Sequence, residues 1–344
     1  YVMSEAGYQK QWQPITKQTY EEFGKPLSYN VLWQKAKVLA LPSSQRSNIP
    51  TRSPNIIVRE NLPKISIITP SFNHVNFLEE CIDSILSQKY PNLEYIIMDG
   101  GSNDGSVEII KKYEKYLSYW QSQPDRGHYA AVNQGFIKST GQIMAWLNSD
   151  DKYHPDAFFK VAAVFTNRQD IQWLMGKPTL WDEQGSIITV HQIPQDVPKW
   201  SRNYILSKKW LLEQKWIQQE SIFWHRSLWQ KAGSCLSNNE RLAGDFELWL
   251  RFSRYAQLFV VDELIGGFRK HETNRSKLFF EEYLLEVEQL LNQEQMLIDR
   301  GEYTNPLPAP EPITISAAEI TAVKNNMLLK QPKFKVSAII STYN

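Results

Sequence analysis

The sequence predicts an α/β fold: a mixed, mostly parallel β-sheet with flanking helices, plus helical extensions before and after it. After Pro63, short apolar runs alternate with amphipathic segments, at a spacing typical of βαβ units. Polar clusters also follow three of the predicted strands, at 69–73, 99–105 and 148–151. Ligands bind beyond the carboxyl ends of strands in such sheets, so these clusters predict a nucleotide site.

The spacing of apolar residues predicts the individual strands and helices. Strands are predicted at 65–68, 95–98, around Trp120, at 143–147 and at 258–261. The first helix has its apolar face made by Phe77, Leu78, Cys81, Ile82, Ile85 and Leu86, and the second by Val107, Ile110, Tyr113 and Leu117. Further helices are predicted at 129–137, 155–165 (with Pro155 in the first turn), 246–252, 278–298 (ended by Gly301) and 317–330.

Composition divides the chain into four parts. A helical extension with a Pro-rich linker is predicted at 1–62, the sheet domain at 63–277, and C-terminal helices with a second Pro-rich linker at 278–332. The segment 333–344 repeats the first strand: Lys335–Asn344 aligns with Lys64–Asn73. This repeat predicts a second copy of the domain that is cut short. Because the chain begins with Tyr1 rather than Met, we expect it to be part of a longer protein.

Charge and cysteine content exclude several classes of protein. The 344 residues carry 38 Lys+Arg and 37 Asp+Glu, a balance that argues against nucleic-acid binding through bulk positive charge. Cys81 and Cys235 are too few for a disulfide scaffold or a four-thiolate zinc site, and free thiols are favoured over a single bridge. No apolar run approaches the roughly 18–20 residues that span a bilayer, and no signal peptide is visible. We expect a cytoplasmic protein, with peripheral membrane attachment as a second option.

Acidic residues supply the candidate chemistry. Asp150 and Asp151 follow a predicted strand, and a divalent cation bound to phosphate would neutralise them; an Asp-rich turn that caps the next helix is the alternative. Asp99 could accept a hydrogen bond from a base or ribose, although Asp-Gly-Gly-Ser is also an ordinary turn. Asp245 lies where a predicted helix begins, which suits either a general base or a helix cap. His271 lies in a polar stretch after two glycines, where a solvated side chain is the alternative.

Together these clusters resemble the family 2 glycosyltransferases with the GT-A fold, over about Lys64 to Ser276. The resemblance rests on motifs that occur in order along the chain. Those on the nucleotide side are Thr69-Pro-Ser-Phe-Asn73, Ile97-Met-Asp-Gly-Gly-Ser-Asn-Asp-Gly105, Gln123-Pro-Asp-Arg-Gly127 with Asn133-Gln-Gly135, and Trp146-Leu-Asn-Ser-Asp-Asp151. Those on the acceptor side are Gln219-Glu-Ser-Ile-Phe223, Asp245-Phe-Glu-Leu-Trp249 and the stretch around His271.

The resemblance implies a role for each matching residue. The nucleotide-sugar site would comprise Pro70, Ser71, Phe72, Asp99, Asp125, Arg126, Asn133 and Ser149. Asp150 would hold Mn²⁺ or Mg²⁺ against the diphosphate, with His271 as a second ligand and Asp151 adjacent. Asp245 would be the general base of an inverting transfer from a nucleoside-diphosphate sugar, most simply a UDP-sugar. The acceptor, whether carbohydrate, lipid-linked or protein, stays open.

Departures from the family pattern keep alternatives open. Asn148 replaces the first aspartate of the usual metal-binding element, and Gly100 replaces an acidic residue of the second loop. No Gln-x-x-Arg-Trp element of processive synthases is present, so transfer of one or a few sugars in glycan or polysaccharide biosynthesis is expected. A nucleotide-sugar or glycan binding module without turnover is the alternative, whereas a nicotinamide-dependent oxidoreductase lacks its glycine fingerprint. The tryptophans at 200–229 are read as core, with a sugar platform as the alternative.

Overall fold

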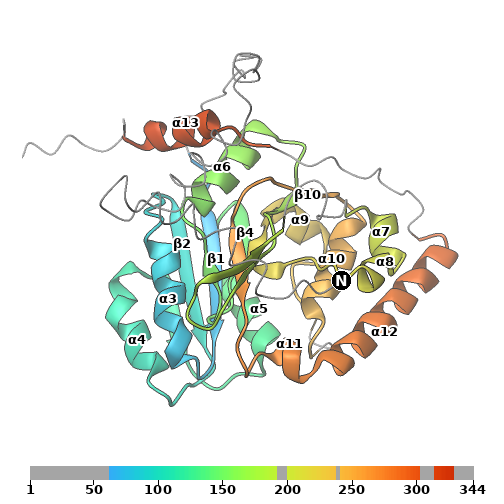
Figure 1. Ribbon diagram of the computed structural model, residues 1–344, viewed down its shortest axis with the longest axis horizontal. Helices are drawn as coiled ribbons and strands as arrows, with labels where there is room; N and C mark the ends of the chain where they lie inside the picture. The colour runs from blue at the N-terminus through green and yellow to red at the C-terminus, as the bar shows by residue number, and fades with distance from the viewer. Residues whose placement is uncertain (1–61, 192–199, 238–240, 303–313, 329–344) are drawn as a thin grey trace, which may run out of the picture. The chain divides into compact units, whose positions relative to one another are not determined.

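The computed structural model describes residues 62–191, 200–237, 241–302 and 314–328 (Figure 1). The predicted N-terminal extension, the second Pro-rich linker and the C-terminal repeat therefore lie almost wholly outside the described residues. In the described part, no helix combines the length and the apolar character that crossing a membrane requires.

The central sheet is mixed and mostly parallel, as predicted. Its strand order is β10-β6-β9-β4-β1-β2-β3. The strands are β1 (Ile65–Ser71), β2 (Leu93–Asp99), β3 (Tyr119–Ser122), β4 (Ile143–Trp146), β6 (Trp173–Met175), β9 (Ile222–His225) and β10 (Leu258–Val260). β1 pairs in parallel with β2 and β4, and β2 with β3. Only β9, between β4 and β6, runs antiparallel to its neighbours in this sheet.

A second, smaller sheet packs beside the first and supplies residues to the same site. Its order is β5-β11-β7-β8, formed by β5 (Lys152–Tyr153), β11 (Gly266–Arg269), β7 (Thr179–Trp181) and β8 (Ile187–Val190). β11 pairs antiparallel with β5, which directly follows the Asp150–Asp151 turn. Residues more than 100 positions apart in the chain thereby become neighbours.

Helices flank the sheets (Figure 1). The connections of the first half are α3 (Val75–Leu86), α4 (Ser106–Tyr113), the 3₁₀ turn η2 (Glu114–Tyr116), α5 (His128–Lys138) and α6 (Ala157–Asn167). Those of the second half are α7 (Arg202–Leu206), α8 (Lys209–Leu212), η3 (Gln219–Ser221), α9 (Arg226–Lys231), α10 (Gly244–Ser253), α11 (Arg275–Leu278), α12 (Phe280–Asp299) and α13 (Ala317–Leu328).

The predicted helices are present, with shifted ends. α6 begins at Ala157 rather than at Pro155, because Asp156 adopts a left-handed conformation with φ 66° and cannot continue a helix backwards. α4 ends at Tyr113, and Leu117, which we predicted on its apolar face, lies beyond η2 in an extended conformation. α12 ends as predicted before Gly301, whose φ of 75° favours glycine.

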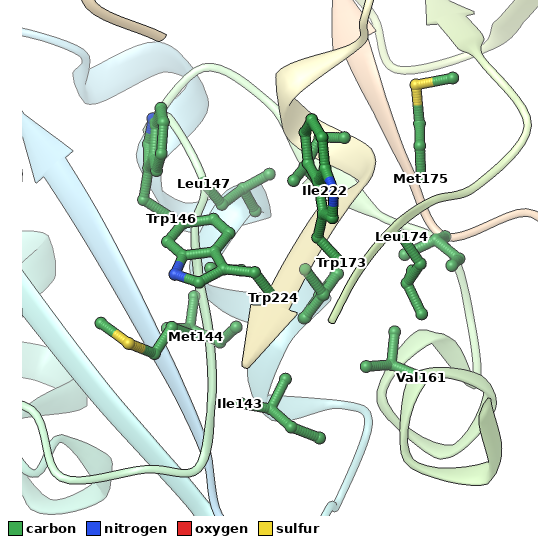
Figure 2. Packing of buried hydrophobic residues seen from close by; sticks show 14 of the residues in the cluster. Ile143, Met144, Trp146, Leu147, Val161, Trp173, Leu174, Met175, Ile222 and Trp224 are labelled. Carbon is green, nitrogen blue, oxygen red and sulfur yellow. The ribbon is translucent and has the colours of Figure 1, made fainter. Parts of the chain in front are cut away.

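Aromatic side chains fill the core between β4, β6, β9 and α10. Figure 2 shows Trp146, Trp173 and Trp224 close together between these strands. The rings of Trp146 and Trp224 meet edge to face at 5.6 Å, and Trp146 stacks on Trp249 at 5.7 Å and 11°. Of the tryptophans at 200–229, four are buried as predicted, and only Trp216 is half-exposed. Cys81 and Cys235 are both free thiols, also as predicted.

Candidate active site

The carboxyl ends of β1, β2 and β3 meet in register at one edge of the sheet. Ser71 pairs with Asp99, and Asp99 with Ser122. The Asp99 carboxylate is only 1% exposed and accepts hydrogen bonds from the Gly101 and Ser102 backbone N–H groups and from the Ser102 and Ser122 hydroxyls, at 2.6–3.0 Å. Asp99 therefore holds the second loop in shape.

The first and second loops are tied together. Asn73, at φ 54°, donates its backbone N–H to Ser102 and accepts a hydrogen bond from the Asn103 N–H. Phe72 is 58% exposed beside this junction. Pro70 and Ser71 are buried in the last residues of β1, and the Ser71 hydroxyl has no partner among the described residues.

The neighbours of Gly100 show which side chains meet at the second loop. A Cβ there would lie 3.2 Å from an Asp125 carboxylate oxygen and 3.3 Å from the Phe72 ring. An acidic side chain at position 100 would thus be crowded by Phe72 and Asp125. The glycine at position 100 therefore matches the space available. Its neighbours Phe72 and Asp125 show that the first, second and third loops meet here.

The third loop leads into α5. Asp125 accepts the backbone N–H of Gly127 at 2.7 Å, and Arg126 is exposed between them. Asn133, predicted to lie near the sugar, both donates to the Leu236 carbonyl and accepts from the Leu236 N–H, at 2.9 and 2.7 Å. Asn133 thereby anchors the loop that precedes α10.

The turn after β4 brings the predicted metal ligands together. Asp150 Oδ2 lies 3.0 Å from His271 Nε2, and Ser149 Oγ lies 2.7 Å from His74 Nδ1. Asp151 is fully buried and points the other way: it accepts the Arg269 backbone N–H at 2.7 Å and the Asn148 side-chain N–H at 3.2 Å. Asp150 and His271 face the site, whereas Asp151 fixes the turn.

Electrostatics favour an ionised Asp150. Burial alone would raise its pKa, but the hydrogen bond with His271 and the nearby His74 outweigh burial, and the net effect lowers it. No group of three or more His, Cys, Asp or Glu side chains within the described ranges is arranged to hold a metal ion. A cation on Asp150 and His271 would therefore need the diphosphate for its remaining ligands, an arrangement common for Mg²⁺.

Arg269, which the sequence analysis missed, positions the Asp150 turn. Only 1% exposed, its guanidinium donates to the Asp150 carbonyl at 2.6 Å and to Glu80 at 2.6 Å, and its backbone N–H donates to Asp151. Arg269 lies two residues before His271 on the same segment. It therefore fixes both sides of the Asp150–His271 contact.

Asp245 is the second residue of α10 and is half-buried. It does not cap the helix, since the N-cap is Ala243 without a side-chain cap. Its Oδ1 accepts the Phe246 N–H at 2.8 Å. Burial raises the pKa of Asp245 to about 6, with the Glu286 charge adding to the increase and hydrogen bonds opposing it. At neutral pH this carboxylate is ionised yet poorly solvated, which suits a general base.

Two neighbours hold Asp245 in place. The Tyr129 hydroxyl donates to the Leu242 carbonyl at 2.6 Å and lies 3.4 Å from Asp245 Oδ1. Its ring packs so tightly on Gly244 that a Cβ there would lie 2.7 Å from it. Glu286 of α12 accepts the backbone N–H groups of Leu242 and Ala243, both at 2.8 Å. The start of α10 is thus fixed from two sides.

Glu220 is a buried carboxyl group whose pKa responds to the charges of Asp150 and Asp245. It is 6% exposed in η3, and burial raises its pKa to about 8, with the charges of Asp150 and Asp245 adding to the increase. His128 at the start of α5 has its pKa lowered to about 4, by burial and by the nearby Arg275 and His74. Glu220 lies within a motif quoted above, but nothing in the sequence singled it out.

Comparison with known proteins finds a family match for the first half of this site. Residues 66–193 match the family model described as glycosyl transferase family 2. An uncharacterised glycosyltransferase of Mycobacterium tuberculosis is 34% identical over 116 residues, which cover 33% of this chain and 44% of the relative. One of Rickettsia typhi is 25% identical over 226 residues, covering 64% of this chain and 69% of the relative. The chain thus spans less than half of the first relative's length.

The fold agrees with that match. The crystal structure of TarS from S. aureus in complex with UDP-GlcNAc superposes with a TM-score of 0.53 at 18% sequence identity, covering 67% of this chain and 66% of that one. At this identity the likeness establishes the GT-A fold alone. Residues 66–193, which span β1 to β8 and the strand-end loops described above, therefore match a family 2 glycosyltransferase domain, and the fold is of the GT-A type.

Proposed function

We propose that the protein is a metal-dependent inverting glycosyltransferase that moves a sugar from a nucleoside-diphosphate sugar, most simply a UDP-sugar, to an acceptor hydroxyl. The observation that carries this proposal is the contact of Asp150 with His271 at the turn after β4, found together with the partly buried carboxylate of Asp245. Asp245 would serve as the base, and Asp150 with His271 would hold a cation against the diphosphate. The UDP-GlcNAc complex of the similar TarS structure supports a UDP-sugar as donor.

In this mechanism Asp245 accepts the proton of the acceptor hydroxyl as its oxygen attacks the anomeric carbon. The bond from that carbon to the diphosphate breaks on the opposite face, so one displacement inverts the configuration. When bound, a divalent cation on Asp150 and His271 supplies charge neutralisation for the leaving diphosphate. Arg126, exposed in the third loop, would add positive charge for the diphosphate.

The test is hydrolysis of a panel of nucleotide sugars, with Mn²⁺ or with EDTA, by the wild type and by Asp245→Asn. Slow, metal-dependent release of UDP from one donor is the expected result. No release from any donor, despite UDP binding in the same samples, would instead favour a nucleotide-sugar binding module without turnover. Equal rates for Asp245→Asn and the wild type with an acceptor present would remove Asp245 from the role of base.

A further inference from the structure

The buried imidazole of His271 has a hydrogen-bonding partner at each of its two ring nitrogens. Nε2 lies 3.0 Å from Asp150 Oδ2, and Nδ1 lies 2.9 Å from the hydroxyl oxygen of Thr273. Thr273 is the only side-chain partner that the described part of the chain offers to Nδ1. The proposed function uses Asp150 and His271, but it gives no role to the hydroxyl at the other end of the ring.

Neighbouring groups also fix the position of this ring. The Phe77 ring of α3 lies against the imidazole, with the ring centroids 4.6 Å and the planes 33° apart. Asn274, itself buried, closes the turn that carries His271 and Thr273. Its side-chain oxygen accepts the His271 backbone N–H at 2.7 Å, and its own backbone N–H donates to the His271 carbonyl at 3.3 Å. The imidazole is therefore held between Asp150 and Thr273, and what can change there is which ring nitrogen carries the hydrogen.

The two states of His271 make opposite demands on Thr273. A neutral imidazole has a single N–H, so only one of its nitrogens can donate a hydrogen bond. When Nε2 donates to the ionised Asp150, Nδ1 can only accept, and the Thr273 hydroxyl must donate. When Nε2 offers its lone pair to a cation, the hydrogen is on Nδ1 and needs an acceptor. A hydroxyl serves both states, because it can rotate between donating and accepting.

We infer that Thr273 is a positioning residue of the cation site: its hydroxyl accepts the Nδ1–H of His271 and so presents the Nε2 lone pair beside Asp150. The inference rests on the proposed function, which places a divalent cation on Asp150 and His271. Thr273 would not touch the cation, and it acts only by selecting the form of His271 that can bind one. Removing such an outer partner of a metal-binding histidine typically weakens metal binding about 10- to 100-fold.

Binding of UDP to the full chain, measured by isothermal titration with Mn²⁺ and again with EDTA, tests the role of the hydroxyl without any turnover. Thr273→Val puts a methyl group in the place of the hydroxyl, which also keeps water from that position. This variant should bind UDP as the wild type does in EDTA but about tenfold more weakly with Mn²⁺. Thr273→Ser keeps the hydroxyl and should restore most of that affinity. Thr321→Val, at an exposed position of α13, is the matched control and should bind as the wild type does under both conditions.

The imidazole signals of His271 in ¹⁵N NMR spectra test the mechanism directly, because they distinguish a hydrogen on Nε2 from one on Nδ1. The spectrum of His271→Gln assigns the signals. In the wild type at about pH 8, the hydrogen should be on Nε2 in EDTA and on Nδ1 with UDP and Mg²⁺, which is diamagnetic. At the concentrations of UDP and Mg²⁺ that convert the wild type, Thr273→Val should keep the hydrogen on Nε2.

The possible results separate this inference from the proposed function. The role of the hydroxyl would be overturned if Thr273→Val kept the full Mn²⁺-dependent affinity, if the Val and Ser variants lost equally, or if Thr273→Val bound UDP more weakly in EDTA as well. Metal-dependent release of UDP in the hydrolysis panel would then leave the proposed function standing. The expected losses of affinity and changes in the His271 signals, without turnover of any donor, would support the role of Thr273 and overturn the proposed function. UDP binding by the wild type that is the same with Mn²⁺ and with EDTA would overturn the cation site, and the role of Thr273 with it.

Discussion

Burial disfavours the ionised form of Asp245 and raises its pKa to about 6, so the activity should depend on pH in this range. As a base it acts only when ionised, so the transfer rate should fall as pH drops through about 6. Asp245→Asn should lower kcat at least about 100-fold, the usual contribution of general base catalysis, and should remove this acid limb. Rates measured from pH 5 to 8 on both proteins check this. An unchanged acid limb in the variant would assign the titration to another group.

The same burial predicts a gain in stability for that variant. The pKa of Asp245 is higher in the folded chain than its ordinary value of 3.8, so the folded state holds the proton more tightly. The free-energy cost of ionising Asp245 in the folded protein is absent below about pH 4, grows between about pH 4 and 6 and is fully present above about pH 6. Asp245→Asn should therefore raise the free energy of unfolding at pH 7.5 by about 1–2 kcal/mol, after allowance for the partial exposure of the side chain, and should leave it unchanged at pH 4. Denaturant unfolding of both proteins at the two pH values checks this.

Glu220 offers a contrast, because burial raises its pKa to about 8 and the folded protein holds it largely protonated at neutral pH. Gln is close in shape and neutral, so Glu220→Gln should keep transfer within about tenfold of the wild type. Glu220→Ala should lose more, since it leaves a cavity and unpaired polar groups beside Asp151. Steady-state kinetics at pH 7 on the two variants gives the comparison. A Gln variant as impaired as the Ala variant would show that Glu220 works as a carboxylate.

Helix α12 contacts the start of α10 through Glu286. Its carboxylate accepts the backbone N–H groups of Arg241, Leu242 and Ala243 before α10 and raises the pKa of Asp245 by its charge. Glu286→Gln keeps an oxygen that can accept the Leu242 and Ala243 hydrogen bonds but removes the charge. The acid limb of the pH–rate profile should therefore move to lower pH. Glu288→Gln, an exposed position on the same helix, is the control and should leave the profile where it is.

Elements with a long hydrophobic pattern were predictable, and short ones were not. β1 and β2 each have seven residues of nearly continuous burial, and α3 carries a clear apolar face. β5, β7 and β11 have two to four residues each, too few for a period, and they become strands only because partners distant in the chain pair with them. The sheet that carries Arg269 was therefore invisible in the sequence.

The residues of the candidate site also fall into two groups, those that local sequence suggested and those that depend on distant contacts. Asp245, Asp150 and His271 stand in local patterns of polar residues at element ends, and the sequence alone suggested them. Arg269 and Glu286 act through contacts with residues 189 and 44 positions away, to Glu80 and Leu242. No local pattern encodes such pairings. The candidate residues for the chemistry could be proposed from their neighbours in sequence, whereas the residues that position them needed the folded chain.

For the molecule as a whole, ligand binding should raise the stability of the fold, measured as Tm. A ligand that binds only the folded state adds about 2.7 kcal/mol at 100 times its Kd, so UDP with Mn²⁺ should raise Tm by several degrees. NAD should leave Tm unchanged, because the glycine fingerprint of dinucleotide sites is absent from the sequence.

The metal-dependent part of that increase should disappear with EDTA and in Asp150→Asn, since Asp150 and His271 are the protein groups that would share the cation with the diphosphate. Asp170→Asn is the matched control, because Asp170 is exposed and its ion pair is with Arg168 at the end of α6. It should respond to UDP and Mn²⁺ as the wild type does. If Asp150→Asn kept the full Mn²⁺-dependent shift, the cation would be held by other groups. Because the native turn uses Asn148 to hold Asp151 rather than to face the site, we expect Asp150 to supply the only carboxylate ligand.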